Sequence, residues 1–207
     1  MTTMERRATN RAPELRAAGD DGNVAKGYAA LFNVEADIGG YFRERILPGA
    51  FADALKPGAD VLALHSHDTG RVIGRSIAGT LRLAEDTTGL AVEIDLPDTG
   101  DGRDLAVQLE RGDIRGMSFG FRVTHDEWDE SGEIPWRKIH KPGLYGVWAV
   151  ANPAYGDTSL ALRSLDAARN EKRRKNFSEV ARRLRAKATL DLVGRGVKLE
   201  AIPPKAQ

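Results

Sequence analysis

The segment Arg115–Phe121, with the sequence RGMSFGF, most constrains the fold, because small and large residues alternate along it. At the two-residue period of a β-strand, Met117, Phe119 and Phe121 point to one face, and Ser118 lies on the other between two glycines. The first face is that of a buried strand. The second predicts a serine hydroxyl open to a substrate, because glycine within a strand often marks close approach of a ligand or of another backbone. An edge strand with a serine of no special role would explain the same pattern.

Length and composition exclude several kinds of protein. A chain of 207 residues can bury one sizeable core and have residues left for tails. Its formal net charge of +1 gives no reason to expect nucleic acid as a specific partner. The lack of cysteine excludes disulfides, thiolate metal sites and a cysteine nucleophile. No stretch has the apolar run of a signal peptide or a membrane span, so we expect a soluble protein of the cytoplasm with no membrane partner.

The chain divides into three parts by composition. Residues 1–20 are polar, charged and rich in alanine, which predicts a disordered N-terminal arm. Residues 21–164 contain the turn signals and apolar alternation of a folded domain. Residues 165–207 form a basic tail, in which positions 166–187 contain nine Lys/Arg and three Asp/Glu. Apolar residues recur there at helical spacing, so the tail is predicted to be a weakly amphipathic helix.

The folded part contains many short strand patterns and few helices. The stretch Ile73–Leu96 alternates as a hairpin, and Gly102–Arg111 is a helix followed by Gly112 as its C-terminal cap. This pattern predicts an α+β, mainly β fold: a mostly antiparallel, closed β-barrel surrounded by a few helices.

Histidine is the scarcest candidate for chemistry, with four in the chain: His65, His67, His125 and His140. His65 and His67 share one face if their strand is regular, at a separation of roughly 7 Å. A metal site would need a third ligand, and Asp68 points to the opposite face of that strand. We therefore predict no metal and no cofactor.

The segment GMSFG also satisfies the G-x-S-x-G pattern of α/β-hydrolases. In that fold the serine sits on a sharp turn between a strand and a helix. Here Phe119–Thr124 continues as a strand after Ser118, and no parallel βαβ repeats accompany it. An esterase of that type is therefore the third-ranked alternative.

Several motifs occur together in one order: VLALHSHD, IGR, GLAVEIDLPDT, a helix, GDIRGMSFGFRV and LYGVWAVANPAYGDT. In this order they resemble the prohead (capsid maturation) serine proteases of tailed phages, over residues 27–164. The resemblance implies a serine endopeptidase whose fold is similar to that of the herpesvirus assemblins. Carried over by motif, Ser118 is the nucleophile and His67, which precedes Asp68, is the general base. His65 is then a neighbour of the base.

The third catalytic residue is less defined by this resemblance. Assemblin-like sites have a second histidine on the strand after the serine, which implies His140 as the residue that orients His67. Many phage relatives instead carry an acid where this chain has Gly146. Asp68, an acid of the 125–135 turn or a water molecule are the alternatives to His140.

The resemblance also implies a biological role. The enzyme would process the scaffolding region of the major capsid protein, and itself, inside the immature capsid in the host cytoplasm. Self-association into a homo-oligomer is compatible with this role. The alternative is a catalytically inactive capsid-assembly or scaffold protein with the same barrel. The basic tail, which lies outside the matching region, would dock on an acidic scaffold and be dispensable for cleavage.

Overall fold

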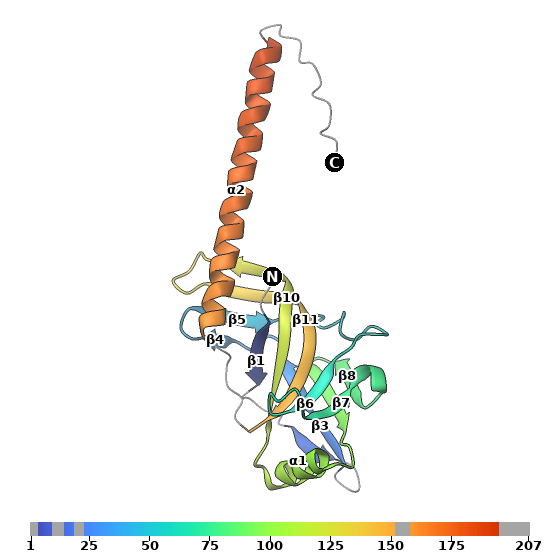
Figure 1. Cartoon of the computed structure of the whole chain (residues 1–207). Coiled ribbons are helices and arrows are strands. Elements are labelled where there is room, and N and C mark those ends of the chain that lie inside the picture. The colour runs from blue at the N-terminus through green and yellow to red at the C-terminus, as the bar shows by residue number, and fades with distance from the viewer. Residues whose placement is uncertain (1–3, 10–14, 19–22, 152–157, 195–207) are drawn as a thin grey trace. The chain divides into compact units, whose positions relative to one another are not determined.

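The computed structural model describes residues 4–9, 15–18, 23–151 and 158–194 (Figure 1). The chain divides into two compact units, Met1–Leu162 and Arg163–Gln207. All the described strands lie in the first unit, and the second consists mainly of the helix α2 (Thr158–Gly194). Among the described residues, no helix is both long and apolar enough to span a membrane.

The larger of two sheets has seven strands and is built around a long hairpin (Figure 1). Its order is β1-β10-β11-β5-β4, and β11 also pairs with β6, which pairs with β7. The strands are β1 (Glu5–Thr9), β4 (Ala36–Ile38), β5 (Phe42–Ile46), β6 (Leu62–His65), β7 (Val72–Arg75), β10 (Gly116–Asp129) and β11 (Trp136–Val150).

Strand β11 organises this sheet because it is long enough to take two partners on one edge. It pairs antiparallel with β10 on one side. On the other side it pairs in parallel with β5 along residues 136–139 and with β6 along residues 146–149. The segment after β6 thereby starts beside Trp148 and Ala149 of β11, which are the partners of Ser118 and Met117 in β10.

The smaller sheet has four strands in the order β2-β3-β9-β8, all paired antiparallel. They are β2 (Arg16–Ala18), β3 (Val24–Leu31), β8 (Leu81–Glu85) and β9 (Gly89–Asp95), with the short 3-10 helix η1 (Ser76–Ala78) before β8. The helix α1 (Gly100–Arg111) begins after Thr99, whose hydroxyl accepts a hydrogen bond from the Gly102 N–H. It ends at Gly112 with φ of 76°, as the sequence predicted.

The α+β, mainly β class is confirmed, but the two sheets do not close into a barrel. Between the sheets the described residues form a single isolated bridge, which joins Phe32, just after β3, to Ile46, the last residue of β5. A closed barrel needs a continuous ladder around the whole sheet. Here the ladders stop at β1, β4 and β7 in one sheet and at β2 and β8 in the other.

The core lies between the two sheets and includes the predicted apolar face of β10. Met117, Phe119 and Phe121 are each no more than 2% exposed. The ring of Phe51 packs edge-on against Phe119 at 5.8 Å, and Phe119 stacks on Phe121 at 5.1 Å. Each such buried aromatic stabilises the fold by roughly 2–3 kcal/mol relative to exposure.

The N-terminal residues differ from the expected disordered arm. Within residues 1–20, β1 pairs with β10 and β2 pairs with β3. The side chains that hold β1 are charged, because Glu5 and Arg7 are 4% and 5% exposed. A reading based on apolar residues therefore missed this strand.

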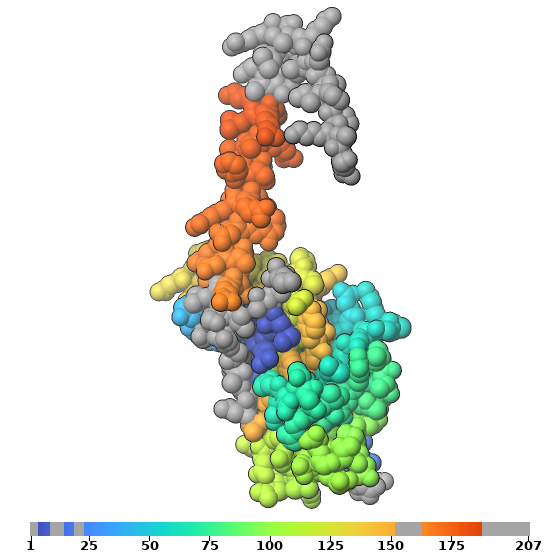
Figure 2. Space-filling view, in the orientation of Figure 1, coloured from blue at the N-terminus to red at the C-terminus, as the bar shows by residue number. Residues whose placement is uncertain are grey.

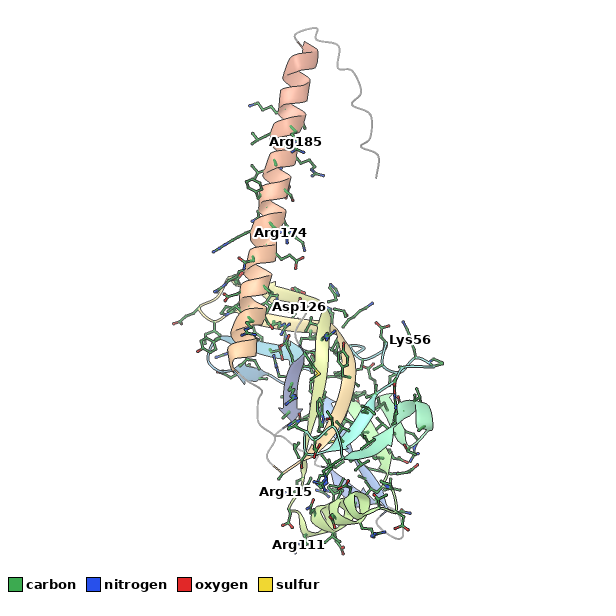
Figure 3. The ribbon with its side chains drawn as sticks, viewed as in Figure 1. Lys56, Arg111, Arg115, Asp126, Arg174 and Arg185 are labelled. Carbon is green, nitrogen blue, oxygen red and sulfur yellow. The ribbon has the colours of Figure 1, made fainter. Side chains whose placement is uncertain are left out.

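A cluster of buried charges joins β1, β5 and β11. Arg7 donates to Glu44 at 2.7 Å and to Glu5 at 2.8 Å. Arg137 donates to Glu5 at 2.8 Å and to Glu44 at 3.0 Å. Burial lowers the pKa of both guanidinium groups, but the carboxylates more than offset it, so both pKa values lie above the ordinary value. Asp126, labelled in Figure 3, also pairs with Arg137.

We predict that Glu44→Gln destabilises the fold by roughly 3–5 kcal/mol, because it leaves two buried guanidinium groups short of a counter-charge. Urea unfolding of the variant and the wild type measures this loss. The matched control is Glu93→Gln, which removes an exposed carboxylate that pairs with Lys26 and Arg82. Equal unfolding midpoints for the two variants would contradict a structural role for the cluster.

Candidate active site

Ser118 lies in the middle of the larger sheet, on the face opposite to the core residues of β10. Its neighbours across the ladders are Ala8 of β1 and Trp148 of β11. The serine is only 2% exposed. The sequence predicted an open hydroxyl, so this is a correction: neighbouring side chains cover the residue.

Trp148 explains why the glycine at position 120 does not open the site. A Cβ atom built on Gly120 would lie 2.1 Å from Cη2 of Trp148 and 2.8 Å from its Cζ3. The indole therefore occupies the space that the missing side chain leaves. Gly120 permits close packing of a ring from the adjacent strand, and not the approach of a substrate.

His67 lies over the same indole. Strand β6 ends at His65, and Ser66 adopts a left-handed backbone with φ of 57°, which turns the chain. The imidazole of His67 is exposed, and its centre lies 5.2 Å from that of the Trp148 ring. Ser118 and His67 are thus both neighbours of Trp148, although they are not hydrogen-bonded to each other within the described part of the chain.

His65 does not share this environment. It pairs with Ala149 of β11 and is 2% exposed in the core. The predicted common face of His65 and His67 is wrong, because the turn at Ser66 breaks the two-residue alternation of the strand. That His65 is a neighbour of the base and not itself catalytic stays a prediction.

Arg6 supplies positive charge beside the histidine. It lies opposite Gly120 in the ladder between β1 and β10, and its guanidinium carbon lies 5.8 Å from the Trp148 ring centre. Partial burial lowers the pKa of His67, and the charge of Arg6 lowers it further. The imidazole is therefore neutral at neutral pH, which is the form that a general base needs.

The structure does not bring His140 to this site. His140 lies eight residues before Trp148 on β11, which corresponds to roughly 26 Å along a strand. Its ring centre lies 4.8 Å from that of His125, and its Nε2 lies 3.5 Å from Glu127. Contact between His140 and His67 is excluded by this distance, so the orienting role predicted for His140 is wrong.

The other candidates for a third residue also lack contact with His67. Asp68 accepts a hydrogen bond from the Gly70 N–H at 2.8 Å within its own turn. Asp126 and Glu127 pair with Arg137 and Lys138 at the distant end of the hairpin. Among the described residues, none of the carboxylates forms an ion pair or hydrogen bond with His67, and no group of three His, Asp or Glu side chains is arranged to hold a metal ion.

Comparison with known proteins identifies the family. The model of the caudovirus prohead serine proteases matches residues 9–172, which include Ser118, His67 and the whole β10–β11 hairpin. This chain belongs to that family. The prohead protease of Enterobacteria phage HK97 is 34% identical over 119 residues, which are 56% of this chain. The chain spans about half the length of that curated relative, 49%. No solved structure matches this chain.

The prohead protease match covers β2–β11 and the beginning of α2, but it starts at the last residue of β1. Arg6 therefore lies outside the matched region. Sequence patterns based on apolar residues did not reveal it, because β1 is held by charged side chains. Trp148 lay inside a recognised motif, but nothing in the motif indicated that its ring would cover Gly120. Gly120 and Gly146 pair across the adjacent strands. Two glycines in the strand motifs are a signal that could have indicated room for a large ring on that face.

We predict that Gly120→Ala displaces the Trp148 indole and destabilises the fold by about 1–3 kcal/mol, as overpacking does elsewhere. Unfolding monitored by tryptophan fluorescence measures the change. The control is Gly132→Ala, in an exposed turn where a Cβ would lie 3.8 Å from the Ile134 carbonyl oxygen. In a Trp148→Val background, Gly120→Ala should lower the unfolding free energy by less than it does in the wild type. Equal losses in the two backgrounds would contradict direct packing.

Proposed function

We propose that this chain is a serine endopeptidase that cleaves the scaffolding region of the major capsid protein, and itself, inside the immature capsid in the host cytoplasm. Ser118 is the nucleophile and His67 is the general base. The observation that carries the proposal is the placement of both residues around Trp148 in a chain of the prohead protease family. The name of the HK97 relative supports the same class of reaction.

The chemistry follows from the weakness of serine as a nucleophile. His67 accepts the Ser118 hydroxyl proton as the oxygen attacks the scissile carbonyl carbon, and a tetrahedral oxyanion forms. The same imidazole then gives that proton to the leaving amine, and the peptide C–N bond breaks. Water, deprotonated by His67, hydrolyses the acyl-enzyme and restores the serine. A pKa below the ordinary histidine value suits the proton-accepting steps.

Two arginines near β6 and β7 already have carboxylate partners: Arg71 pairs with Asp101 at 2.6 Å, and Arg75 pairs with Asp60 at 2.5 Å. Backbone N–H groups are the usual donors to the oxyanion in serine enzymes.

An inactive capsid-assembly protein with the same fold is the second candidate. The burial of Ser118 and the lack of a described acid beside His67 favour it. The two candidates differ in one property: whether the Ser118 hydroxyl reacts as a nucleophile. A protease requires the side chains over Ser118 to move when a substrate binds.

The test is labelling of the purified chain with a fluorophosphonate, together with cleavage of a scaffold fragment. We expect the wild type to be labelled on Ser118, and Ser118→Ala to lose both labelling and cleavage with an unchanged unfolding midpoint, because only a hydroxyl is removed. His67→Ala should reduce labelling by two or more orders of magnitude, roughly as loss of a general base does. Cleavage by Ser118→Ala at the wild-type rate would disprove the assignment, and a fully folded, unreactive wild type would favour the inactive alternative.

The pH dependence of kcat/KM tests the position of Arg6. His67 accepts a proton only when neutral, so activity falls as pH drops through its lowered pKa. Arg6→Gln removes a positive charge that disfavours the imidazolium, so the pKa rises and the acidic limb moves to higher pH. The control Lys26→Gln, in the other sheet, should leave the limb in place. Identical shifts in both variants, or none in Arg6→Gln, would contradict this effect.

A further inference from the structure

Helix α2 carries large apolar side chains that no described residue covers. Phe177, Val180 and Leu184 are 78%, 53% and 63% exposed. Their spacing of three and four residues places them on one side of the helix, as a stripe about 10 Å long. Figure 2 shows the side chains of this part of the chain, in orange. Exposed residues that form a contiguous apolar stripe mark an interaction surface.

Exposed basic side chains border this stripe on both sides. At 100° per residue, Arg174, labelled in Figure 3, lies along one edge, about 60° from Phe177, and Lys187 lies along the other, about 20° from Val180. Arg173 continues the line of the stripe by one turn towards the N-terminus. All three side chains are exposed. The surface is therefore a narrow apolar strip between cations.

The acidic residues of the same stretch lie away from the stripe. Glu179 is turned about 130° from the centre of the stripe and pairs with Arg183 at 2.6 Å. Glu171 is turned about 150° from it and pairs with Lys175 at 2.7 Å. The negative charge of this stretch thus lies away from the stripe, and positive charge lies beside it.

We propose that this face of α2 binds an acidic amphipathic helix of a partner protein. The apolar residues of the partner would cover Phe177, Val180 and Leu184, and its carboxylates would pair with the bordering cations, as the outer charges do in coiled coils. No residue of this face belongs to the candidate active site, so the interaction is a means of recruitment that does not depend on the proposed catalysis.

Charge and shape favour this occupant over others. Residues 166–187 carry nine Lys/Arg and three Asp/Glu, so two copies of the helix would repel each other. Nucleic acid would leave the apolar stripe in water. A helix that lies in a membrane surface carries a broad apolar face, whereas this strip is one to two residues wide.

The test uses the full chain and a synthetic acidic helix of about four heptads, with leucine at the core positions and glutamate at the flanks. We expect the affinity to fall about tenfold or more in Phe177→Ala/Leu184→Ala, because two apolar anchors are lost. Alanine favours helix, so circular dichroism should show that α2 persists. Affinity should also decline as salt rises.

A charge pair provides the matched control. Arg173→Gln/Lys187→Gln removes two cations beside the stripe, and Lys175→Gln/Arg182→Gln removes two on the opposite side. We expect the first pair to weaken binding several-fold more than the second, whereas equal losses would overturn the proposal. Wild-type affinity in Phe177→Ala/Leu184→Ala would also overturn it.

Two further outcomes would assign the face to another occupant and overturn the proposal. One is self-association in sedimentation that Phe177→Ala abolishes. The other is tighter binding to duplex DNA or to phosphatidylglycerol vesicles than to the acidic helix. Cleavage of a short scaffold peptide should be unchanged in every α2 variant, so failure of docking and failure of catalysis are distinguished.

Discussion

The Trp148 indole packs directly on two glycines, Gly120 and Gly146, and this packing determines the surroundings of Ser118. Gly120 and Gly146 are partners across the β10–β11 ladder, and Cζ2 of the indole would lie within 3.8 Å of a Cβ on either. A Cβ at Gly146 would also lie 3.0 Å from the Leu62 carbonyl oxygen. A carboxylic acid side chain at this position would therefore crowd both the indole and β6. The ring and the glycines have to be considered as one unit.

The buried charges on one face of β1 determine what lies on the other. Glu5 and Arg7 point inward to the ion cluster, so Arg6 and Ala8, which alternate with them, lie on the face of Ser118. A slip of one residue would bury Arg6 and expose the cluster. The register that places a cation beside His67 is thus set by ion pairs on the opposite side of the sheet.

The sequence was sufficient where apolar pattern and local caps decide the structure. It predicted the buried face of Met117 and Phe119, the helix ending at Gly112, and the basic helix after the domain. It failed where the outcome depended on a partner distant in sequence. The role of Gly120 is set by Trp148, and the position of His140 is set by the length of β11.

Two other failures have local causes that composition conceals. A single left-handed residue, Ser66, separates His65 from His67, and serine carries no strong signal for that backbone conformation. Strand β1 is held by charged side chains, which sequence patterns assign to solvent. In the first case the resemblance to a family still singled out His67 as the proposed general base, because motif order does not depend on knowing which side chain is buried.

The near-neutral net charge of the chain conceals a separation of charge along it. The whole chain carries +1, and residues 166–187 carry an excess of six positive charges, so the remainder has an excess of five negative charges. An acidic partner is attracted to α2 and repelled by the rest of the chain at distances within a Debye length of about 10 Å. Charge therefore directs such a partner to the helix, and leaves the face around Ser118 for a substrate that need not be acidic. The net charge of the whole chain therefore could not reveal this basic segment.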